Sequence, residues 1–215
     1  ENVYDNYTEI GGQDDYSIDP SMLIARAYIT RKRGKKVHNQ PVMVIGQEKG
    51  HGQEFRNGGS VKPWGNAKAL HYMKVAETEN IPIHTYIFTP GSYPIEDYPG
   101  AAQQSAKNLY EMAGLKVPIV AVISEGGSGG ALAIGVGDRV NMLQYSTYSV
   151  ITPEGCASIL WRDAGRAKDA AEALGLTAPR LKELGLIDKI IREPTGGAHR
   201  NPRSMAIRLK AVLLN

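Results

Sequence analysis

Cysteine is scarce in this chain of 215 residues, and long apolar runs and a strong net charge are absent. The single cysteine, Cys156, excludes an intrachain disulfide and a cysteine-rich zinc site, and it indicates a reducing compartment. No run approaches the ~18 apolar residues of a membrane-spanning helix. Lys and Arg number 25 against 22 Asp and Glu, so the net charge of +3 does not indicate nucleic-acid binding. Membrane and nucleic-acid partners are therefore not expected.

Glycine, in contrast, is plentiful: 24 of 215 residues, or about 11% against a usual ~7%. Part of the fold must need backbone without side chains. The length suits one domain with one core, and we expect an approach segment over residues 1–20 and a single domain over residues 21–215. Because the first residue is Glu1 rather than Met, we expect the chain to be a piece of a longer protein.

Strand-like and helix-like patterns alternate along the chain, which indicates an α/β fold with a largely parallel sheet. Two runs rich in β-branched residues, 22–30 and 41–46, flank the basic segment 31–36, and we expect an antiparallel pair joined by a solvated turn. A glycine-rich loop follows over 47–65, and no regular structure is expected before residue 21. We expect further strands at 83–88, 117–123 and 139–143, and helices at about 66–81, 102–114, 155–173, 177–184 and 202–214.

The most informative feature is the glycine turn, Gly126-Gly127-Ser128-Gly129-Gly130, between a buried strand and a helix. The first turn of a helix leaves about four amides without partners, and the helix dipole adds roughly half a positive charge there. Without Cβ atoms, a reacting group can approach this backbone closely. The turn therefore predicts an anion site or an oxyanion hole, in which one donor typically contributes ~3 kcal/mol to a transition state. The alternative is a purely structural turn, in which the glycines only let helix and sheet touch.

Two phosphate-binding motifs fail at the glycine turn. A dinucleotide fingerprint would need a third glycine where Leu132 stands, and a P-loop would need Lys followed by Ser or Thr. A nucleophile elbow, G-x-S-x-G, does match, with Ser128 at its centre. Its partners would be Asp163 or Asp188 and then His199, in the order that such hydrolases use. A serine hydrolase is therefore a competing prediction.

The other candidate residues carry weaker signals. The histidines at positions 38, 51, 71 and 84 lack the mutual spacing of metal ligands, so we expect no metal site. Cys156 stands at a predicted helix start and is interpreted as a small buried residue rather than a nucleophile. Tyr145 and Tyr148 are interpreted as packing at a strand edge, and the segment 196–200 as the entry to the last helix.

The run 125–161, which begins EGGSGGALAIGVGD and ends PEGCASILW, resembles the carboxyltransferase α subunit of bacterial and plastid acetyl-CoA carboxylase. Further short motifs agree with this family, in the same order, from about residue 5 to the end of the chain. They are the segments 41–46, 49–50, 56–57, 68–70, 89–91, 178–184, 193–194 and 196–199. Many short motifs in one order make the resemblance specific.

The resemblance implies a crotonase/ClpP-like fold of repeated ββα units and a homologous β subunit in an α2β2 assembly. It implies an active site between the subunits, where carboxybiotin on the biotin carboxyl carrier protein gives its carboxyl group to acetyl-CoA, and malonyl-CoA for fatty acid synthesis results. By the same resemblance, the N–H groups of Gly129 and Gly130 form the oxyanion hole for the biotin-side oxygen, and residues 126–128 line the carboxybiotin site. The resemblance also implies that the reaction needs biotin and coenzyme A and that this chain holds no metal. It implies a location in the bacterial cytoplasm or the plastid stroma.

The chain departs from the family pattern in several loops. The family has Asp where Phe88 stands, and His-Gln-Lys-Gly-Arg where residues 47–51 read QEKGH. The segment 95–101 lacks the family's acidic stretch, and the region between Arg56 and Ala67 lacks the family's aromatic residue and its Tyr-Arg pair. These loops are expected near the carboxybiotin pocket and the partner surface. A non-catalytic binding or regulatory homologue is therefore a second hypothesis.

The catalytic hypothesis makes two predictions about this chain. It predicts no activity without the β subunit. It also predicts that a bulkier residue at Gly129 or Gly130 abolishes transfer without unfolding the chain. The hydrolase hypothesis depends instead on Ser128, whose replacement by Ala would abolish hydrolysis.

Overall fold

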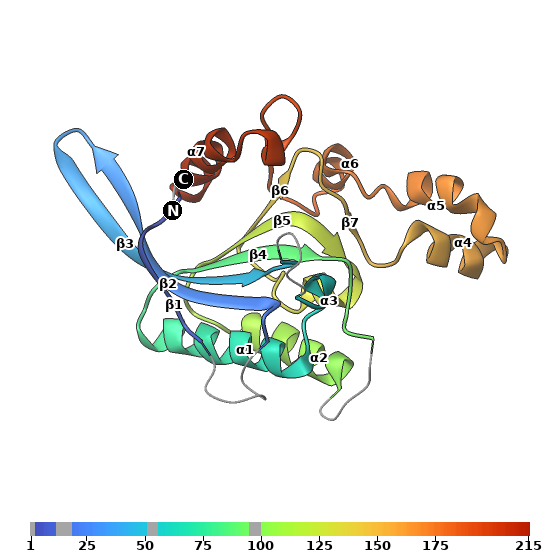
Figure 1. Ribbon diagram of the computed structural model, residues 1–215, viewed down its shortest axis with the longest axis horizontal. Helices are drawn as coiled ribbons and strands as arrows, with labels where there is room; N and C mark the ends of the chain where they lie inside the picture. Colours follow the sequence, from blue (N-terminus) through green and yellow to red (C-terminus); the bar gives the residue numbers. More distant parts are fainter. Residues whose placement is uncertain (1–2, 12–18, 51–55, 95–99) are drawn as a thin grey trace.

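The computed structural model describes residues 3–11, 19–50, 56–94 and 100–215. A long antiparallel hairpin of β2 (Met22–Arg33) and β3 (Lys36–Gln47) pairs over its full length. Gly34 turns the chain with a φ of 58°, which glycine adopts without strain. The predicted antiparallel pair and its solvated basic turn are confirmed. The strands are longer than predicted because the polar residues around the turn continue the ladder beyond the sheet, where the hairpin projects outward (Figure 1).

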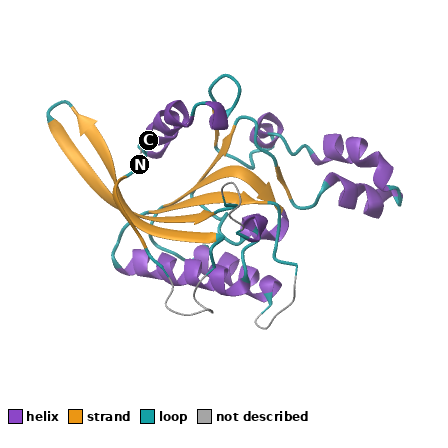
Figure 2. Ribbon diagram, in the orientation of Figure 1, coloured by secondary structure: helices purple, strands orange, loops and turns teal. Residues whose placement is uncertain are grey.

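Parallel strands continue the sheet from β3, and Figure 2 shows them in orange beside the hairpin. They are β4 (Ile83–Thr89), β5 (Ile119–Gly127), β6 (Arg139–Leu143) and β8 (Lys189–Ile191), in the order β3-β4-β5-β6-β8. The short β1 (Asp5–Glu9) pairs antiparallel with β2, and β7 (Tyr148–Ser149) pairs parallel with β5. The prediction of an α/β fold with a largely parallel sheet is therefore confirmed.

Helices cover both faces of the sheet (Figure 1). α1 (Pro63–Thr78) and α2 (Ala101–Met112) lie side by side on one face, and α7 (Pro202–Leu213) packs on the other. The remaining helices are α3 (Ser128–Leu132), α4 (Pro153–Trp161), α5 (Ala167–Leu174) and α6 (Ala178–Glu183). In Figure 1, α4 and α5 project from the sheet as a helical arm. Within the described residues, no helix is both long and apolar enough to cross a bilayer.

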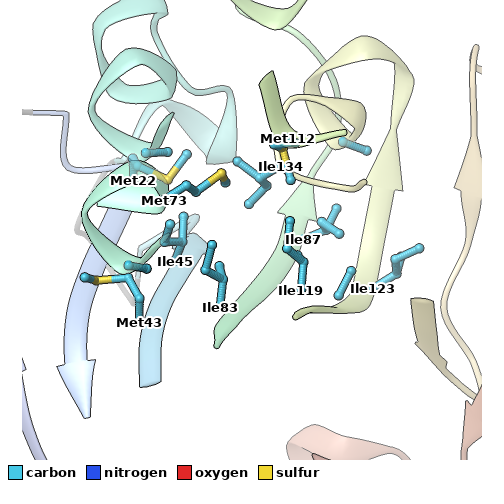
Figure 3. Packing of buried hydrophobic residues seen from close by; sticks show 14 of the residues in the cluster. Met22, Met43, Ile45, Met73, Ile83, Ile87, Met112, Ile119, Ile123 and Ile134 are labelled. Carbon is cyan, nitrogen blue, oxygen red and sulfur yellow. The ribbon is translucent and has the colours of Figure 1, made fainter. Parts of the chain in front are cut away.

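The sheet face under α1 and α2 is apolar. Ile45, Ile83, Ile87 and Ile123 come from three neighbouring strands and are at most 1% exposed, and Met73 of α1 is fully buried in the same cluster (Figure 3). Full burial of one such side chain contributes about 1.5–3 kcal/mol. Through this face, β3, β4 and β5 therefore pack tightly against α1.

The opposite face of β4 buries polar side chains instead. His84 is 4% exposed, and its Nδ1 lies 2.8 Å from the hydroxyl of Tyr4. The Tyr4 hydroxyl in turn lies 2.5 Å from the hydroxyl of Tyr86. Burial lowers the pKa of His84 to about 4 and raises the pKa of both tyrosines. Leu213 of α7 packs in the same cluster as these rings.

One predicted helix is wrong, because residues 155–173 form two helices rather than one. α4 ends at Trp161, and its C-cap residue, Arg162, has a left-handed backbone with a φ of 55°. The carboxylate of Asp163 then accepts a hydrogen bond from the Gly165 N–H group and begins a new turn before α5. Local capping has therefore overridden the continuous helical pattern.

Two boundaries also differ from prediction. β1 lies within residues 1–20, where no regular structure is expected, because its pairing with β2 depends on residues distant in sequence. α1 begins at Pro63, inside the predicted loop 47–65, as is common for proline in a first helical turn. The division of the chain at residue 20 remains a prediction.

Candidate active site at the glycine turn

A β-bulge lies directly before the glycine turn. Ile87 of β4 pairs with Ile123 of β5, but the next residue, Phe88, pairs with Glu125. Ser124 is therefore left without a partner on β4. A bulge bends its strand and changes the direction of the side chains that follow, and it is frequent beside active sites. Here it brings Glu125 next to Phe88.

The glycine turn is divided between a strand and a helix. β5 continues to Gly127, beyond its predicted end, and α3 begins at Ser128 and has only five residues. Ser128 has a φ of 51°, which a non-glycine residue rarely adopts and which often marks a functional site. Because α3 is so short, its dipole is smaller than that of the longer helix expected from the sequence. The turn therefore acts mainly through individual N–H groups.

The neighbouring loop after β4 packs on two of the glycines. A Cβ atom at Gly127 or Gly130 would lie 1.9 or 2.4 Å from a backbone oxygen of Pro90–Gly91, so neither can be replaced without moving that backbone. At Gly129 the nearest atom would be the hydroxyl of Ser92, at 3.1 Å. At Gly130 the structure instead predicts that a bulkier residue destabilises the chain, because the Gly91 backbone would have to move. For Gly129, tolerance of a bulkier residue without unfolding remains a prediction.

The first glycine of the turn is enclosed by an aromatic ring. A Cβ atom at Gly126 would lie 2.7 Å from the Tyr148 ring, because β7 pairs with the end of β5 at this point. Tyr148 packs against the main apolar core, as predicted. Tyr145, for which the same packing was predicted, is instead 67% exposed, so that prediction is wrong. Gly126 is thus a position where packing alone demands glycine.

The amides of Gly129 and Gly130 lie in the first turn of α3. In the described part of the chain, neither N–H group donates a hydrogen bond, as is expected for a first helical turn. Gly129 is partly exposed and Gly130 is buried. Two adjacent unpartnered donors on bare backbone form the kind of arrangement that stabilises a developing oxyanion.

Gln47, the last residue of β3, connects two parts of this site. Its side chain is buried, and its Nε2 donates to the carbonyl oxygen of Gly130 at 2.7 Å. Its Oε1 accepts a hydrogen bond from the Phe88 N–H group at 3.2 Å. One carboxamide therefore ties the ends of β3 and β4 to the first turn of α3.

A charged and aromatic cluster lies beside the turn. The Nζ atom of Lys49 is 2.5 Å from Oε2 of Glu125 and 4.6 Å from the centroid of the Phe88 ring. Both charged side chains are partly exposed, so the ion pair and the cation–π contact each contribute no more than about 1 kcal/mol. Phe88, a departure from the family pattern, therefore has a defined contact in this chain.

A cavity of about 790 Å³ opens at the ends of the strands, on the side that α7 covers. Its lining includes Gln47, Tyr86, Phe88, Ser124, Ser146 and His199. Glu193 organises its rim, since Oε1 accepts from the Tyr145 N–H group at 3.0 Å and Oε2 from the Ala198 N–H group at 2.7 Å. The segment 196–200 leads through a short 3-10 turn into α7, as predicted, and also lines this cavity. Mixed apolar and polar walls are typical of small-molecule sites.

The described residues contain no catalytic triad around Ser128. The carboxylate of Asp163 caps a turn in the helical arm, and the carboxylate of Asp188 accepts from the Val140 N–H group at 2.7 Å. Neither bonds to His199, and His199 does not bond to Ser128, in the part of the chain that the structure describes. The hydrolase prediction thus lacks the geometry that it requires.

The remaining candidates do not converge on a metal site. His84 belongs to the buried network, His38 lies on the exposed hairpin and Cys156 is buried, as predicted. Across residues 3–11, 19–50, 56–94 and 100–215, no group of three His, Cys, Asp or Glu side chains could hold a metal ion. His51 and residues 95–99, which carry two of the departures from the family pattern, lie outside the described residues.

Two solved structures share the fold of this chain. A transcarboxylase 12S structure with methylmalonyl-coenzyme A and methylmalonic acid bound superposes with a TM-score of 0.73 at 21% identity, covering 98% of this chain and 40% of that chain. The β subunit of Pseudomonas aeruginosa geranyl-CoA carboxylase gives 0.66 at 15% identity, covering 98% and 39%. The predicted crotonase-like α/β fold is therefore confirmed, and it is a fold that carboxyltransferases use.

Sequence comparison identifies the family. Residues 1–215 match the model of the family described as acetyl co-enzyme A carboxylase carboxyltransferase-like, and the chain belongs to this family. The acetyl-coenzyme A carboxylase carboxyl transferase subunit alpha of Stenotrophomonas maltophilia (strain K279a) is 55% identical over 219 residues, and that of Xanthomonas oryzae pv. oryzae (strain MAFF 311018) is 53% identical. Each alignment covers 99% of this chain and 66% of the relative. The chain thus spans just under two thirds of the length of these relatives.

Sequence reasoning located the glycine turn but missed the residues that hold it. It noted Gln47 and Phe88 only as departures from the family pattern, and it assigned no role to Glu125 or Glu193. No local signal indicates these roles, because each contact joins segments that are distant in sequence. Only the polar character of Gln47 at the end of an apolar strand hints at a buried hydrogen bond.

Proposed function

We propose that this chain is the α-type half of a biotin-dependent carboxyltransferase, which transfers a carboxyl group from carboxybiotin to acetyl-CoA and so forms malonyl-CoA for fatty acid synthesis. The observation that carries the proposal is the pair of unpartnered amides at Gly129 and Gly130, in a chain of a carboxyltransferase-like family. The names of the relatives support both the substrate and the reaction.

The role of the two amides is electrostatic. As the carboxyl group leaves carboxybiotin, negative charge develops on the ureido oxygen. Amides of Gly129 and Gly130 that donate to this oxygen bind it more strongly in the transition state than in the ground state, and this difference lowers the barrier. One such donor typically contributes ~3 kcal/mol. No side chain of this chain has to ionise for this step.

The residues at the turn fit a carboxybiotin substrate. Around Gly129, the nearest neighbour of an added Cβ would be the Ser92 hydroxyl at 3.1 Å rather than backbone, so this amide is less enclosed than that of Gly130. In this proposal Gly126, Gly127 and Ser128 shape the wall of the carboxybiotin site. The cavity of about 790 Å³ is connected to the turn through Gln47, although none of residues 126–130 lines it, and the Tyr86 and Phe88 rings in its lining offer apolar surface for a ring system.

The proposal includes partners that this chain does not contain. A homologous β subunit completes the active site in an α2β2 assembly and holds most of the acyl-CoA. The biotin carboxyl carrier protein brings carboxybiotin, and the reaction takes place in the bacterial cytoplasm or the plastid stroma. The designation of the relatives as subunit alpha supports a multi-subunit enzyme.

Reconstitution tests this proposal directly. The chain is assayed alone and together with a β subunit, with carboxylated carrier protein and acetyl-CoA, and malonyl-CoA is measured by chromatography. We expect malonyl-CoA only from the complex. Full activity of the isolated chain would contradict the shared active site, and an inactive complex would contradict the proposed reaction.

A non-catalytic homologue that binds the same partners is the second candidate function. The observation that favours it is Phe88, an uncharged ring that stands where the family has Asp and that lies against Lys49 beside its ion pair with Glu125. This candidate predicts a stable complex with the β subunit, detected by size-exclusion chromatography, that forms no malonyl-CoA.

A further inference from the structure

We propose that Gln47 is a positioning residue, which orients the amides of Gly129 and Gly130 through the carbonyl group of Gly130. This inference rests on the proposed function. Gln47 is 5% exposed, and both ends of its carboxamide are used. Nε2 donates to the Gly130 carbonyl at 2.7 Å, while Oε1 accepts from the Phe88 N–H group at 3.2 Å.

The position of the Gly130 carbonyl explains why a side chain is needed there. α3 ends at Leu132, so the Gly130 carbonyl is one of the last four carbonyl groups of this helix, for which the helix itself provides no backbone donor. A buried carbonyl without a donor loses its hydrogen bond to water and gains none in return, which is unfavourable. Gln47 supplies a donor from β3 and thereby links the turn to the rigid sheet.

Gly130 is held from two sides. On one side the Gln47 carboxamide binds its carbonyl, and on the other its Cα packs so closely on Gly91 that an added Cβ would lie 2.4 Å from the Gly91 oxygen. Glycine has the widest conformational freedom of any residue, so an unrestrained Gly129-Gly130 pair would sample many orientations. The two contacts limit rotation about the Gly130 backbone bonds and keep its N–H group in one direction.

The hydrogen bond has a direction that a test can exploit. The Gln47 amide donates to Gly130 and accepts from Phe88, whereas an ionised carboxylate at the same place can only accept. Gln47→Glu keeps the size and the bond from Phe88 but removes the donor to Gly130. Gln47→His restores a donor, since an imidazole N–H group can occupy a similar place. Gln47→Met removes both bonds without introducing charge.

Asn141 provides a matched control. It is 4% exposed, and its Nδ2 donates to a backbone carbonyl, that of Ala121, within the strands β5 and β6. Asn141→Asp therefore buries the same change of amide to carboxylate, away from the glycine turn. Its expected effect is on stability, with little effect on transfer.

The experiment measures the reconstituted carboxyltransferase complex and the amide hydrogen exchange of the chain. For Gln47→Glu and Gln47→Met we expect kcat to fall by about 10²-fold with KM for acetyl-CoA nearly unchanged, because misplaced groups lose transition-state contacts. We expect faster exchange in a peptide that covers α3. Gln47→His should recover most of the activity, and Asn141→Asp should keep kcat and the α3 exchange rate near wild type.

The outcomes separate this inference from the proposed function. If Gln47→Met keeps wild-type kcat and α3 exchange, or if Asn141→Asp lowers kcat as far as Gln47→Glu, the positioning role is wrong. If the wild-type complex transfers no carboxyl group, the proposed function is wrong, and the exchange of α3 in the Gln47 variants alone decides whether Gln47 orders the turn.

Discussion

The two faces of β4 bury opposite kinds of side chain. Toward α1 and α2, Ile83 and Ile87 pack in an apolar cluster and are at most 1% exposed. Toward α7, His84 and Tyr86 form a hydrogen-bonded network with Tyr4. Alternate residues of one strand therefore lie in environments with different chemistry.

The difference shows how stability and function are divided in this fold. The apolar face provides a base whose buried side chains do not titrate, and the chain just after the glycine turn joins that cluster through Ala131 of α3 and through Ile134. The polar face contains groups that titrate, and the cavity of about 790 Å³ opens on the same side. Variants on each face should therefore respond differently to pH.

The largest effect is expected at the glycine turn, where the apolar face meets the loop after β4. Gly127→Ala places a Cβ 1.9 Å from the Pro90 carbonyl oxygen, and we expect a loss of more than about 5 kcal/mol in the free energy of unfolding. Urea unfolding measures this loss. A Gly127→Ala chain that is as stable as wild type would show that the loop moves aside easily.

Gly129→Ala is the matched control for this variant. Its Cβ meets only the Ser92 hydroxyl, at 3.1 Å, so we expect a stability within about 1 kcal/mol of wild type. Under the proposed function, the added methyl group blocks access to the amides and lowers malonyl-CoA formation by about 10²-fold. A fully active Gly129→Ala complex would exclude the oxyanion role of this amide.

A substitution that creates a cavity in the apolar face should lower the free energy of unfolding by less than Gly127→Ala does. Ile87→Ala removes a side chain that is 1% exposed, and we expect a loss of about 3–4 kcal/mol. The loss should be the same at pH 5 and pH 8, because the buried residues of this cluster are all aliphatic or methionine side chains, which do not titrate. Ile159→Ala, at a position 71% exposed in the helical arm, should change stability by less than about 0.5 kcal/mol.

The contribution of the polar face to the free energy of unfolding should depend on pH. Burial lowers the pKa of His84 from its ordinary 6.5 to about 4, so the unfolded chain binds more protons than the folded chain between these values. The contribution of His84 to stability is therefore complete above about pH 6.5 and is lost as the pH falls toward 4. We expect a decrease of about 2–3 kcal/mol in the free energy of unfolding across this range.

A pair of histidine variants isolates this effect. His84→Gln should remove most of this slope, whereas His71→Gln, at an exposed position on α1, should leave it unchanged. Denaturant titrations at several pH values measure both. Equal slopes in wild type and His84→Gln would show that carboxylates, not this imidazole, govern the acid sensitivity.

The smallest effect concerns the hydroxyl that links the polar network. Tyr4→Phe removes the group that bonds to His84 and Tyr86, and we expect a loss of about 1 kcal/mol at pH 7. Thermal unfolding is the measurement. An unchanged stability would mean that water replaces the lost hydroxyl at no cost.

Much of the architecture could be predicted because it depends on neighbouring residues. The helical period of α1, the continuous apolar run of β5 and the glycines of the turn are local patterns, and each predicted the correct kind of element. Predictions failed where distant segments decide the outcome. β5 extends to Gly127 because β7 pairs with its end, and β1 forms because β2 offers it an edge.

The candidate site likewise combines features that the local sequence predicts with features that depend on tertiary structure. Composition and local sequence were enough to locate the glycine turn and, through its motif, the family. Tertiary structure alone shows that Gly127 and Gly130 are required by the loop at Pro90–Gly91 while Gly129 is not, and that Gln47 binds the turn. The physical reason is that steric exclusion and hydrogen bonds act over a few ångströms in space. A sequence pattern records which residues follow one another and does not record which atoms the folded chain brings together.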